Sequence, residues 1–472
     1  MKRRRIGIRK EDDRKVLESR TPLTPADVGE LLTSHPDLEI VVERSYGRGF
    51  AHERVFHDDE YAAAGAVLAD SLDDCPVVLG IKEIPEDDLV ADTTYVFFSH
   101  TFKGQPQNMS MLRKLMDLRC TLIDYEMLVV DVTDEEYRAP KLNDLAPASW
   151  HERTVSFGRQ AGQAGALDSL WALGARLALR GRPEHPLASL RQAKDYRREG
   201  RSFGSLALAK EALTEAGRRL REGDTAQPLV VGIAGRGVTA AGVHEMLDVL
   251  DPAAHRPTPD ELLASDPGTL APGLHVVELG RAHTSPEVFA KLAPRLTLFL
   301  NCIRWEQPPE ERFITRQLAH DLHADGEPTG LLVIGDISCD PGGAVEFSVP
   351  TYVDDPVYVY DPAKGLAPEL ASLRWEDDAD ARRLFAATCS SGLEGDGVVV
   401  MAVTNLPCEL PLDSSTLFSA AFKDHVPAIA AWAEGHPPTD EPLARPVQRA
   451  TLLEKGVLTP DYRYIGERYL DG

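Results

Sequence analysis

The sequence has no long apolar segment, no paired cysteine motif and no excess of basic residues. Its 472 residues include six cysteines, none in a CxxC pair, so free thiols in a reducing compartment are expected. The formal net charge of -24 argues against nucleic acid or an anionic membrane as a partner. No apolar run approaches the length of a membrane span, and Ile6–Ile8 is too short for the core of a signal peptide. These absences predict a cytoplasmic protein.

No pattern of histidines, cysteines and carboxylates predicts a metal site. His320 and His323 could share one face of a helix, but no further cysteine or carboxylate completes a set of ligands. We therefore expect chemistry without a metal ion.

The length and the order of the predicted elements indicate two domains. One hydrophobic core rarely serves more than about 250–300 residues, and this chain is longer. Strands and helices alternate from Ile6 to about Glu152 and again from Pro228, which is typical of mostly parallel sheets. We predict an α/β fold with two Rossmann-like doubly wound domains and a cleft between them. Residues 1–152, completed by about 350–472, are predicted to form the substrate and catalytic domain, and residues 153–349 the second domain.

The second domain contains a Gly-rich turn between a strand and a helix. Gly235, Gly237 and Ala240 make GxGxxA directly after the apolar strand Leu229–Ala234. Gly235 permits a tight turn, Gly237 lets the backbone approach a pyrophosphate, and the helix N-terminus offers free N–H groups to the phosphates. We predict a dinucleotide-binding domain, and an ordinary tight turn is the alternative. The other residues predicted at the cofactor are Arg236, Val238, Asn301 and Ile303.

The choice between NAD and NADP depends on residues beyond the first helix of this domain. An NAD enzyme usually has an acid about 20 residues on that binds the ribose 2′-OH. Here His255 and Arg256 occupy that region, and a guanidinium suits a 2′-phosphate, so we expect NADP bound through Arg256. NAD is the alternative, with Asp251 or Asp260 on the 2′-OH.

Two apolar runs in the first domain each end in an ionisable residue. Lys82 follows Val77–Ile81 in "GIKEIPE", and His100 follows Tyr95–Phe98 in "FFSHTFKGQ". Ligands bind beyond the carboxyl ends of parallel strands, and two neighbouring cations lower each other's pKa. Lys82 and His100 are therefore the predicted acid–base pair. The alternative is a surface ion pair of Lys82 with a neighbouring glutamate and a purely structural His100.

Four further side chains are candidates for substrate binding. Arg20 and Arg153 suit carboxylates, which a guanidinium can bind in bidentate fashion. Glu126 and Asp340 suit an ammonium group. The alternatives are solvated arginines and, for Asp340, capping of the turn that follows it.

The order of several motifs resembles a known enzyme family. "SRTPLTPADVGELL" and "DDEYAAAGAVL" resemble the start of the alanine dehydrogenase and transhydrogenase N-terminal domain. The lysine-ketoglutarate reductase half of aminoadipate-semialdehyde synthase is similar in "GIKEIPE", "FFSHTFKGQ", "LIDYEML", "NCIRWEQ", "DISCDPGGAVEF" and "TNLPCELP". The fungal lysine-forming saccharopine dehydrogenase is similar more distantly. The resemblance covers nearly the whole chain and stops near "PDYRYIGERYL", so we do not expect the glutamate-forming half.

The resemblance implies a reaction and roles for individual residues. The ε-amine of lysine condenses with 2-oxoglutarate, and NAD(P)H reduces the imine to saccharopine; the reverse reaction forms lysine. The acid–base pair of the family corresponds to Lys82 and His100, its N-terminal arginine to Arg20 and its "DxSxD" aspartate to Asp340. We assign Lys82 to the amine nitrogen and His100 to the carbinol oxygen, with the reverse assignment as the alternative. A homo-oligomer is an open alternative to a monomer.

Two other functions are compatible with these residues. One is another amino-acid or opine dehydrogenase of the alanine dehydrogenase group, against which the "NCIRWEQ" and "DISCDPGG" segments weigh. The other is a non-catalytic dinucleotide sensor, which would not need Lys82 and His100 beside an intact Gly-rich turn.

Overall fold

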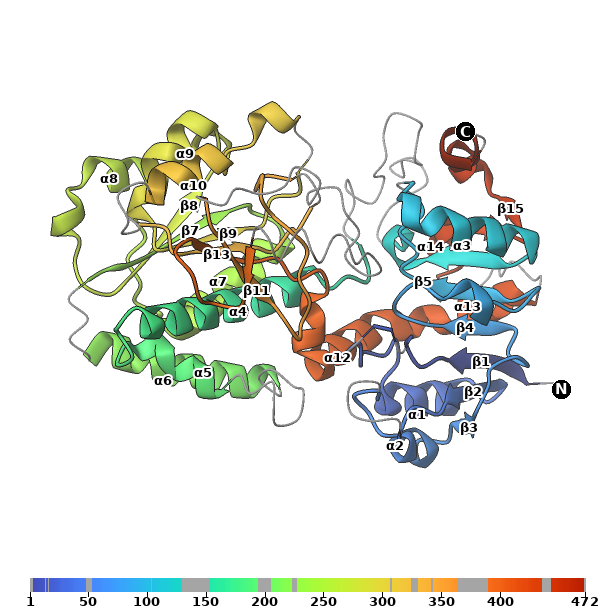
Figure 1. Cartoon of the computed structure of the whole chain (residues 1–472). Helices are drawn as coiled ribbons and strands as arrows, with labels where there is room; N and C mark the ends of the chain where they lie inside the picture. The colour runs from blue at the N-terminus through green and yellow to red at the C-terminus, as the bar shows by residue number, and fades with distance from the viewer. Residues whose placement is uncertain are drawn as a thin grey trace. The chain divides into compact units, whose positions relative to one another are not determined.

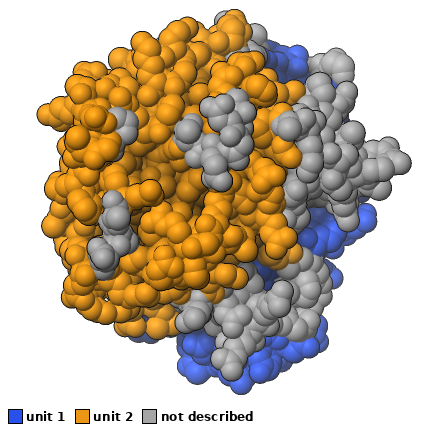
Figure 2. Space-filling view, turned by 60° about the vertical axis from the view of Figure 1, so that its left-hand side comes forward, with its two compact units in different colours: residues 1–157, 411–472 blue, residues 158–410 orange. Residues whose placement is uncertain are grey.

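The computed structural model describes residues 3–12, 14–15, 17–47, 53–102, 104–129, 153–193, 205–222, 227–305, 308–323, 330–340, 343–362, 389–434 and 443–470. The chain divides into two compact units, of which unit 1 contains residues 1–157 and 411–472 and unit 2 contains residues 158–410 (Figure 2). This division differs from the predicted one in residues 153–157, which lie in unit 1, and in residues 350–410. The described strands of that segment pair in the sheet of unit 2, so the segment lies with the second domain.

A mostly parallel sheet forms the centre of unit 1 (Figure 1). Among the described residues it has eight strands in the order β15-β14-β6-β5-β4-β1-β2-β3. Neighbours from β6 to β3 are parallel, whereas β14 is antiparallel to both β6 and β15. The strands are β1 (Arg4–Ile8), β2 (Leu38–Glu43), β3 (Val67–Ala69), β4 (Val77–Leu79), β5 (Thr94–Phe97), β6 (Thr121–Asp124), β14 (Thr451–Glu454) and β15 (Val457–Leu458).

Helices surround this sheet and bury its central strands. Those described are α1 (Pro25–Ser34), α2 (Asp58–Ala63), α3 (Pro106–Asp117), α12 (Pro411–Phe422), α13 (Val426–Ala433), α14 (Ala444–Ala450) and α15 (Arg463–Ile465). Every residue of β4, β5 and β6 is buried, as expected for parallel strands between helical layers. Helix α1 begins where the Thr24 hydroxyl accepts a hydrogen bond from the Asp27 N–H at 3.2 Å, with Pro25 in the first helical position.

Unit 2 has a second parallel sheet, extended by antiparallel strands at one edge. Its described strands lie in the order β12-β11-β13-β10-β9-β7-β8, and β13 through β8 are parallel. The chain passes from β7 to β8 on one side and then to β9 on the other, so the strand order reverses at β7. The strands are β7 (Leu229–Ala234), β8 (Leu274–Leu279), β9 (Leu298–Asn301), β10 (Val333–Asp336), β11 (Val357–Tyr360), β12 (Cys389–Ser391) and β13 (Val398–Met401).

The two sheets confirm the predicted fold class of two Rossmann-like α/β domains. The described helices of unit 2 are α4 (Gly158–Leu179), α5 (Leu190–Ala193), α6 (Leu206–Glu222), α7 (Val238–Leu250), α8 (Pro259–Ala264), α9 (Pro286–Leu292) and α10 (Arg316–His323). The predicted cleft stays a prediction.

Helices α4 and α7 pack closely because each presents a glycine to the backbone of the other. A Cβ atom on Gly162 would lie 1.9 Å from the Thr239 carbonyl oxygen. A Cβ atom on Gly242 would lie 2.1 Å from the Arg159 carbonyl oxygen. Glycine inside a helix costs up to about 1 kcal/mol relative to alanine, so the close packing offsets an intrinsic penalty at both positions.

We expect Gly162→Ala to destabilise unit 2 by about 1–3 kcal/mol, because the added methyl group forces the two backbones apart. Gly158→Ala is the matched control, since its Cβ atom would lie at an ordinary 3.6 Å from the nearest atom, Thr239 Oγ1. Denaturant unfolding of both variants measures the difference. Equal midpoints would contradict the close packing of α4 and α7.

Candidate functional site

Four neighbouring parallel strands of unit 1 are each followed by charged side chains. In the sheet order β6-β5-β4-β1, the residues beyond the carboxyl ends include Glu126, His100, Lys82 and Glu11. Strands β2 and β3 lie on one side of β1, and β4, β5 and β6 lie on the other, so the strand order reverses at β1. Ligands of open α/β sheets bind at such a reversal, beyond the carboxyl ends. The structure therefore brings the predicted pair to one edge of one sheet.

His100 lies between two carboxylates. Its Nδ1 is 3.1 Å from Glu126 Oε2, and its Nε2 is 3.7 Å from Glu83 Oε1. Burial opposes the imidazolium form, but the charges of Glu126 and Glu83 outweigh burial and raise the pKa of His100 above its ordinary value. The direction is opposite to the predicted lowering, because the charge of Lys82 has a smaller effect than the two carboxylates.

The backbone of His100 also carries strain. Its φ of 53° lies in the left-handed region, where non-glycine residues are uncommon. The preceding residue Ser99 donates its N–H to Asp124 Oδ2 at 3.2 Å, and its hydroxyl also binds that carboxylate. Burial and the neighbouring Glu126 charge raise the pKa of Asp124 to about 6. Bonds to β6 thus hold the turn that presents His100.

The turn that carries Lys82 is held by a buried glutamate from the end of β1. Glu11 accepts hydrogen bonds from the N–H groups of Ile81 at 2.7 Å and Lys82 at 3.0 Å. Burial raises the pKa of Glu11. The next residue, Glu83, is bound by the Lys15 ammonium group.

Glu83, next to Lys82 in the chain, is ionised, in contrast to the effect of burial on Glu11. Burial works against its ionisation, but the charges of Lys15, Lys82 and His100 outweigh burial and lower the pKa of Glu83 to about 2. The charge of Glu83 therefore favours the protonated forms of Lys15 and His100.

Arg20 and Arg153 both meet carboxylates within unit 1. Arg153 Nη1 lies 3.1 Å from Glu126 Oε1, so Glu126 bridges this arginine and His100. Arg20 is 4% exposed and donates to both oxygens of Glu18, at 2.7 Å and 2.5 Å. Arg20 is thus not a solvated arginine, and its predicted role toward a substrate carboxylate stays a prediction.

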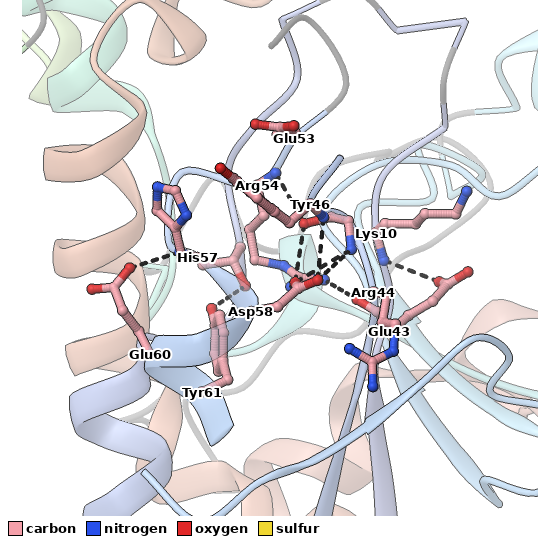
Figure 3. Close-up of polar contacts among 12 residues, drawn as sticks. Lys10, Glu43, Arg44, Tyr46, Glu53, Arg54, His57, Asp58, Glu60 and Tyr61 are labelled. Carbon is pink, nitrogen blue, oxygen red and sulfur yellow. Dashed lines mark hydrogen bonds and ion pairs between the residues drawn. The ribbon is translucent and has the colours of Figure 1, made fainter. Parts of the chain in front are cut away.

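A second buried ion pair supports the segment that carries Arg20 (Figure 3). Arg54 Nη1 lies 3.4 Å from Asp58 Oδ1, and its guanidinium stacks over the Tyr61 ring at 5.2 Å. The Tyr61 hydroxyl donates to the Leu23 carbonyl oxygen at 2.7 Å. Tyr61 of α2 therefore holds the segment just after Arg20 in place through its hydrogen bond to Leu23.

Asp340 belongs to unit 2, unlike the other predicted catalytic and substrate-binding residues. Its Oδ2 accepts a hydrogen bond from the Trp305 N–H at 3.0 Å, and its carbonyl oxygen accepts one from Gly343 at 2.8 Å. These bonds agree with the capping alternative, so its binding of an ammonium group stays a prediction.

The Gly-rich turn of unit 2 lies where the strand order reverses at β7. Gly235 has a φ of +114°, and a Cβ atom there would lie 2.7 Å from the Cys302 carbonyl oxygen, so only glycine fits. A Cβ atom on Gly237 would meet nothing within 4 Å, and no side chain caps α7 at this position. Val238 is 52% exposed at the first residue of that helix. Free N–H groups and open space in front of them fit a dinucleotide pyrophosphate.

Asn301 and Ile303 lie beside this turn, at the carboxyl end of β9. Asn301 pairs in register with Ala234, the last residue of β7. Its side chain donates to Asp336 Oδ1 at 2.8 Å and accepts from the Ile303 N–H at 3.3 Å. The structure thus places both residues beside the Gly-rich turn, with the Asn301 amide holding the loop that follows, and their contact with a dinucleotide stays a prediction.

Arg256 does not lie at this edge, which corrects the prediction made for it. The preceding His255 bridges to His275, the second residue of β8, at the opposite end of that strand from the Gly-rich turn. Arg256 itself forms an ion pair with Asp248. Helix α8 lies between α7 and β8, so a count of about 20 residues from the turn stops short of the strand.

Sequence reasoning missed several charged residues of the site in unit 1. The missed side chains are Glu11, Lys15, Glu18 and Asp124, and Glu83 was considered only as an ion-pair partner. The argument used for Lys82 also applies to Ile6–Ile8, since charged residues follow that run directly. Applied to β1, it would have found Glu11.

The described residues contain neither a cluster of metal ligands nor a membrane-spanning helix. No group of three histidine, cysteine or acidic side chains there could hold a metal ion. The cysteines Cys75, Cys120, Cys302, Cys339 and Cys408 are free. No helix of the described part is both long enough and apolar enough to cross a membrane.

Comparisons with known proteins match the motifs in the sequence. Residues 7–146 match the family model "Alanine dehydrogenase/PNT, N-terminal domain". An alpha-aminoadipic semialdehyde synthase of Arabidopsis thaliana is 29% identical over 98% of this chain and 41% of its own length. A mitochondrial alpha-aminoadipic semialdehyde synthase of Bos taurus is 27% identical over 98% of this chain and 47% of its own. The predicted resemblance is therefore confirmed.

The chain spans less than half of the length of these two relatives. A shorter relative, the saccharopine dehydrogenase [NAD(+), L-lysine-forming] of Emericella nidulans, is 26% identical over 89% of this chain and 90% of its own. Among solved structures, an L-alanine dehydrogenase has a TM-score of 0.54 at 16% identity over 98% of this chain and 99% of its own. A transhydrogenase from Sinorhizobium meliloti has a TM-score of 0.52 at 13% identity, over 96% and 98% of the two chains. These structures show the same fold.

We expect Glu126→Gln to lower the pKa of His100, because the carboxylate that favours the imidazolium form is lost. A rate that needs protonated His100 falls as the pH rises through this pKa, so the corresponding limb of the profile should move to lower pH. NMR titration of the His100 ring and the pH dependence of kcat/KM measure both changes. Glu86→Gln, on an exposed side chain of the loop that also carries Glu83, is the matched control. An unchanged His100 titration in Glu126→Gln would contradict the assignment of this ion pair.

Proposed function

We propose that this chain is an NAD(P)-dependent amino-acid oxidoreductase that reductively condenses L-lysine with 2-oxoglutarate to saccharopine, or catalyses the reverse, lysine-forming reaction. The observation that carries the proposal is the placement of Lys82 and His100 beyond neighbouring strand ends, with His100 held by Glu126 and Glu83. The coarser part, amino-acid oxidation or reduction with a nicotinamide dinucleotide, is supported by relatives that cover nearly the whole chain.

The chemistry needs proton transfer at two different atoms. The lysine ε-amine adds to the carbonyl carbon of 2-oxoglutarate, and the carbinol oxygen leaves as water only after it gains a proton. Carboxylates that raise the pKa of His100 keep its ring protonated to higher pH, which suits a donor to that oxygen. Lys82 then moves the proton at the amine nitrogen. The opposite assignment of the two bases is the alternative.

The dinucleotide supplies the hydride that reduces the imine carbon. Gly235, Gly237 and the N-terminus of α7 would hold its pyrophosphate, with Arg236, Val238, Asn301 and Ile303 around the turn. In unit 1, Arg153 and Arg20 are proposed to face substrate carboxylates, and Glu126 an ammonium group. Asp340, which belongs to unit 2, is also proposed to face an ammonium group. The cytoplasmic location stays a prediction, and so does the choice between a monomer and a homo-oligomer.

The decisive assay follows NAD(P)H oxidation with lysine and 2-oxoglutarate, each omitted in turn. The proposal requires both substrates and a product that contains both carbon skeletons. Turnover with pyruvate and ammonia instead would indicate an alanine dehydrogenase. Nucleotide binding without turnover of any amino acid would indicate a sensor.

We expect Lys82→Met to lower turnover by about 10²–10⁴-fold, the usual contribution of a general acid or base. Affinity for the dinucleotide should stay within about threefold, since Lys82 and the Gly-rich turn belong to different units. Lys291→Met, on the exposed surface of α9, is the matched control and should keep full activity. Steady-state rates and nucleotide titrations test this. More than about a tenth of the wild-type rate in Lys82→Met would remove Lys82 from the acid–base pair.

A further inference from the structure

The carboxyl end of β8 carries basic groups beside the Gly-rich turn. Strands β7 and β8 are parallel, with Ala234 paired to Leu279, so the residues that follow them lie at the same edge. A Cβ atom placed on Gly280 would lie 3.6 Å from Nη2 of Arg236 and 3.7 Å from Nδ1 of His283. Arg236 of the Gly-rich turn and His283 of the turn after β8 therefore meet at Gly280.

Arg281 adds a second guanidinium group to this edge. It is the first residue of a short 3₁₀ helix, Arg281–His283, which Gly280 caps. Arg236 and Arg281 are both exposed, and neither guanidinium has an ion-pair partner among the residues that the structure describes. Nδ1 of His283 is buried without a hydrogen-bond partner there. Polar nitrogen atoms of three side chains thus have no partner among the described residues near the turn.

Glu278, the acidic residue of β8, already has a partner. Glu278 Oε1 lies 3.4 Å from Nε2 of His244 on α7. In NAD enzymes of this fold, an acid near the end of the second strand binds the ribose 2′-OH, whereas an arginine nearby accommodates a 2′-phosphate. Here β8 is followed by Gly280 and Arg281, so the sequence fits the arginine that accommodates a 2′-phosphate.

We propose that Arg236 and Arg281 bind the 2′-phosphate of NADP(H), with the His283 ring beside it. This inference rests on the proposed function, because it specifies which dinucleotide the Gly-rich turn takes. A phosphate monoester is a doubly charged anion at neutral pH, and the chain has a net charge of -24, so local cations must compensate it. Paired guanidinium groups do so with bidentate hydrogen bonds.

The test measures NADPH and NADH affinity by fluorescence titration without any amino-acid substrate. Wild type should prefer NADPH. Arg281→Gln and Arg236→Gln should each weaken NADPH about ten- to a hundredfold, as expected for a charge-assisted hydrogen bond, and change NADH less than about threefold. In competition experiments, both variants should bind 2′,5′-ADP more weakly and 5′-AMP with nearly unchanged affinity. Because the two nucleotides differ only in the 2′-phosphate, this comparison measures the contribution of that group.

Arg256→Ala is the matched control, since this exposed arginine pairs with Asp248 away from the turn and should change neither affinity. A wild-type preference for NADH, an equal loss of both nucleotides in the two variants, or a selective loss of NADPH in Arg256→Ala would overturn the inference. Loss of NADH binding in Glu278→Gln would instead assign this edge to a 2′-OH. Selective NADPH binding by a chain that does not join lysine to 2-oxoglutarate would refute the reaction and leave this inference standing.

Discussion

The carboxylate of Glu126 is the interaction on which the site in unit 1 depends. It is 4% exposed and contacts His100 and Arg153, each at 3.1 Å. A buried carboxylate is costly unless its charge is compensated, so Glu126 favours a charged His100 and fixes the direction of its ring. Glu83, held ionised by Lys15 and Lys82, acts on the other ring nitrogen. The acid–base character of His100 is thus a property of the whole strand-end cluster.

The Gly-rich turn of unit 2 depends on close backbone packing. At Gly235 the chain passes so near the Cys302 carbonyl oxygen that a Cβ atom has no room, and the positive φ excludes most other residues. The same tight turn leaves the N-terminus of α7 uncovered at Gly237. Because Gly237 has no side chain, the backbone N–H groups at the start of α7 are accessible and can donate hydrogen bonds to phosphates.

The positions of Lys82 and His100 could be predicted because strand ends are visible in a sequence. Lys82 and His100 each follow a short apolar run, and parallel strands bring such positions to one edge. The pKa direction of His100 could not be predicted in the same way, because Glu83 and Glu126 come from two other strand ends. The prediction for Arg256 was wrong because α8 lies between α7 and β8. The number of residues after the Gly-rich turn therefore does not show where β8 ends.

Local pattern by itself predicted the α/β class, the Gly-rich turn and the positions of Lys82 and His100 at strand ends, since each depends on apolar runs and turn residues that are visible in the sequence. Only the tertiary structure decided how those pieces combine. It assigned residues 350–410 to unit 2 through strand pairing, placed Glu126 against His100, and brought His283 beside Arg236. The physical reason is the same in each case: the partner is chosen by sheet register and by the need to pair buried charges, and neither is local in the chain.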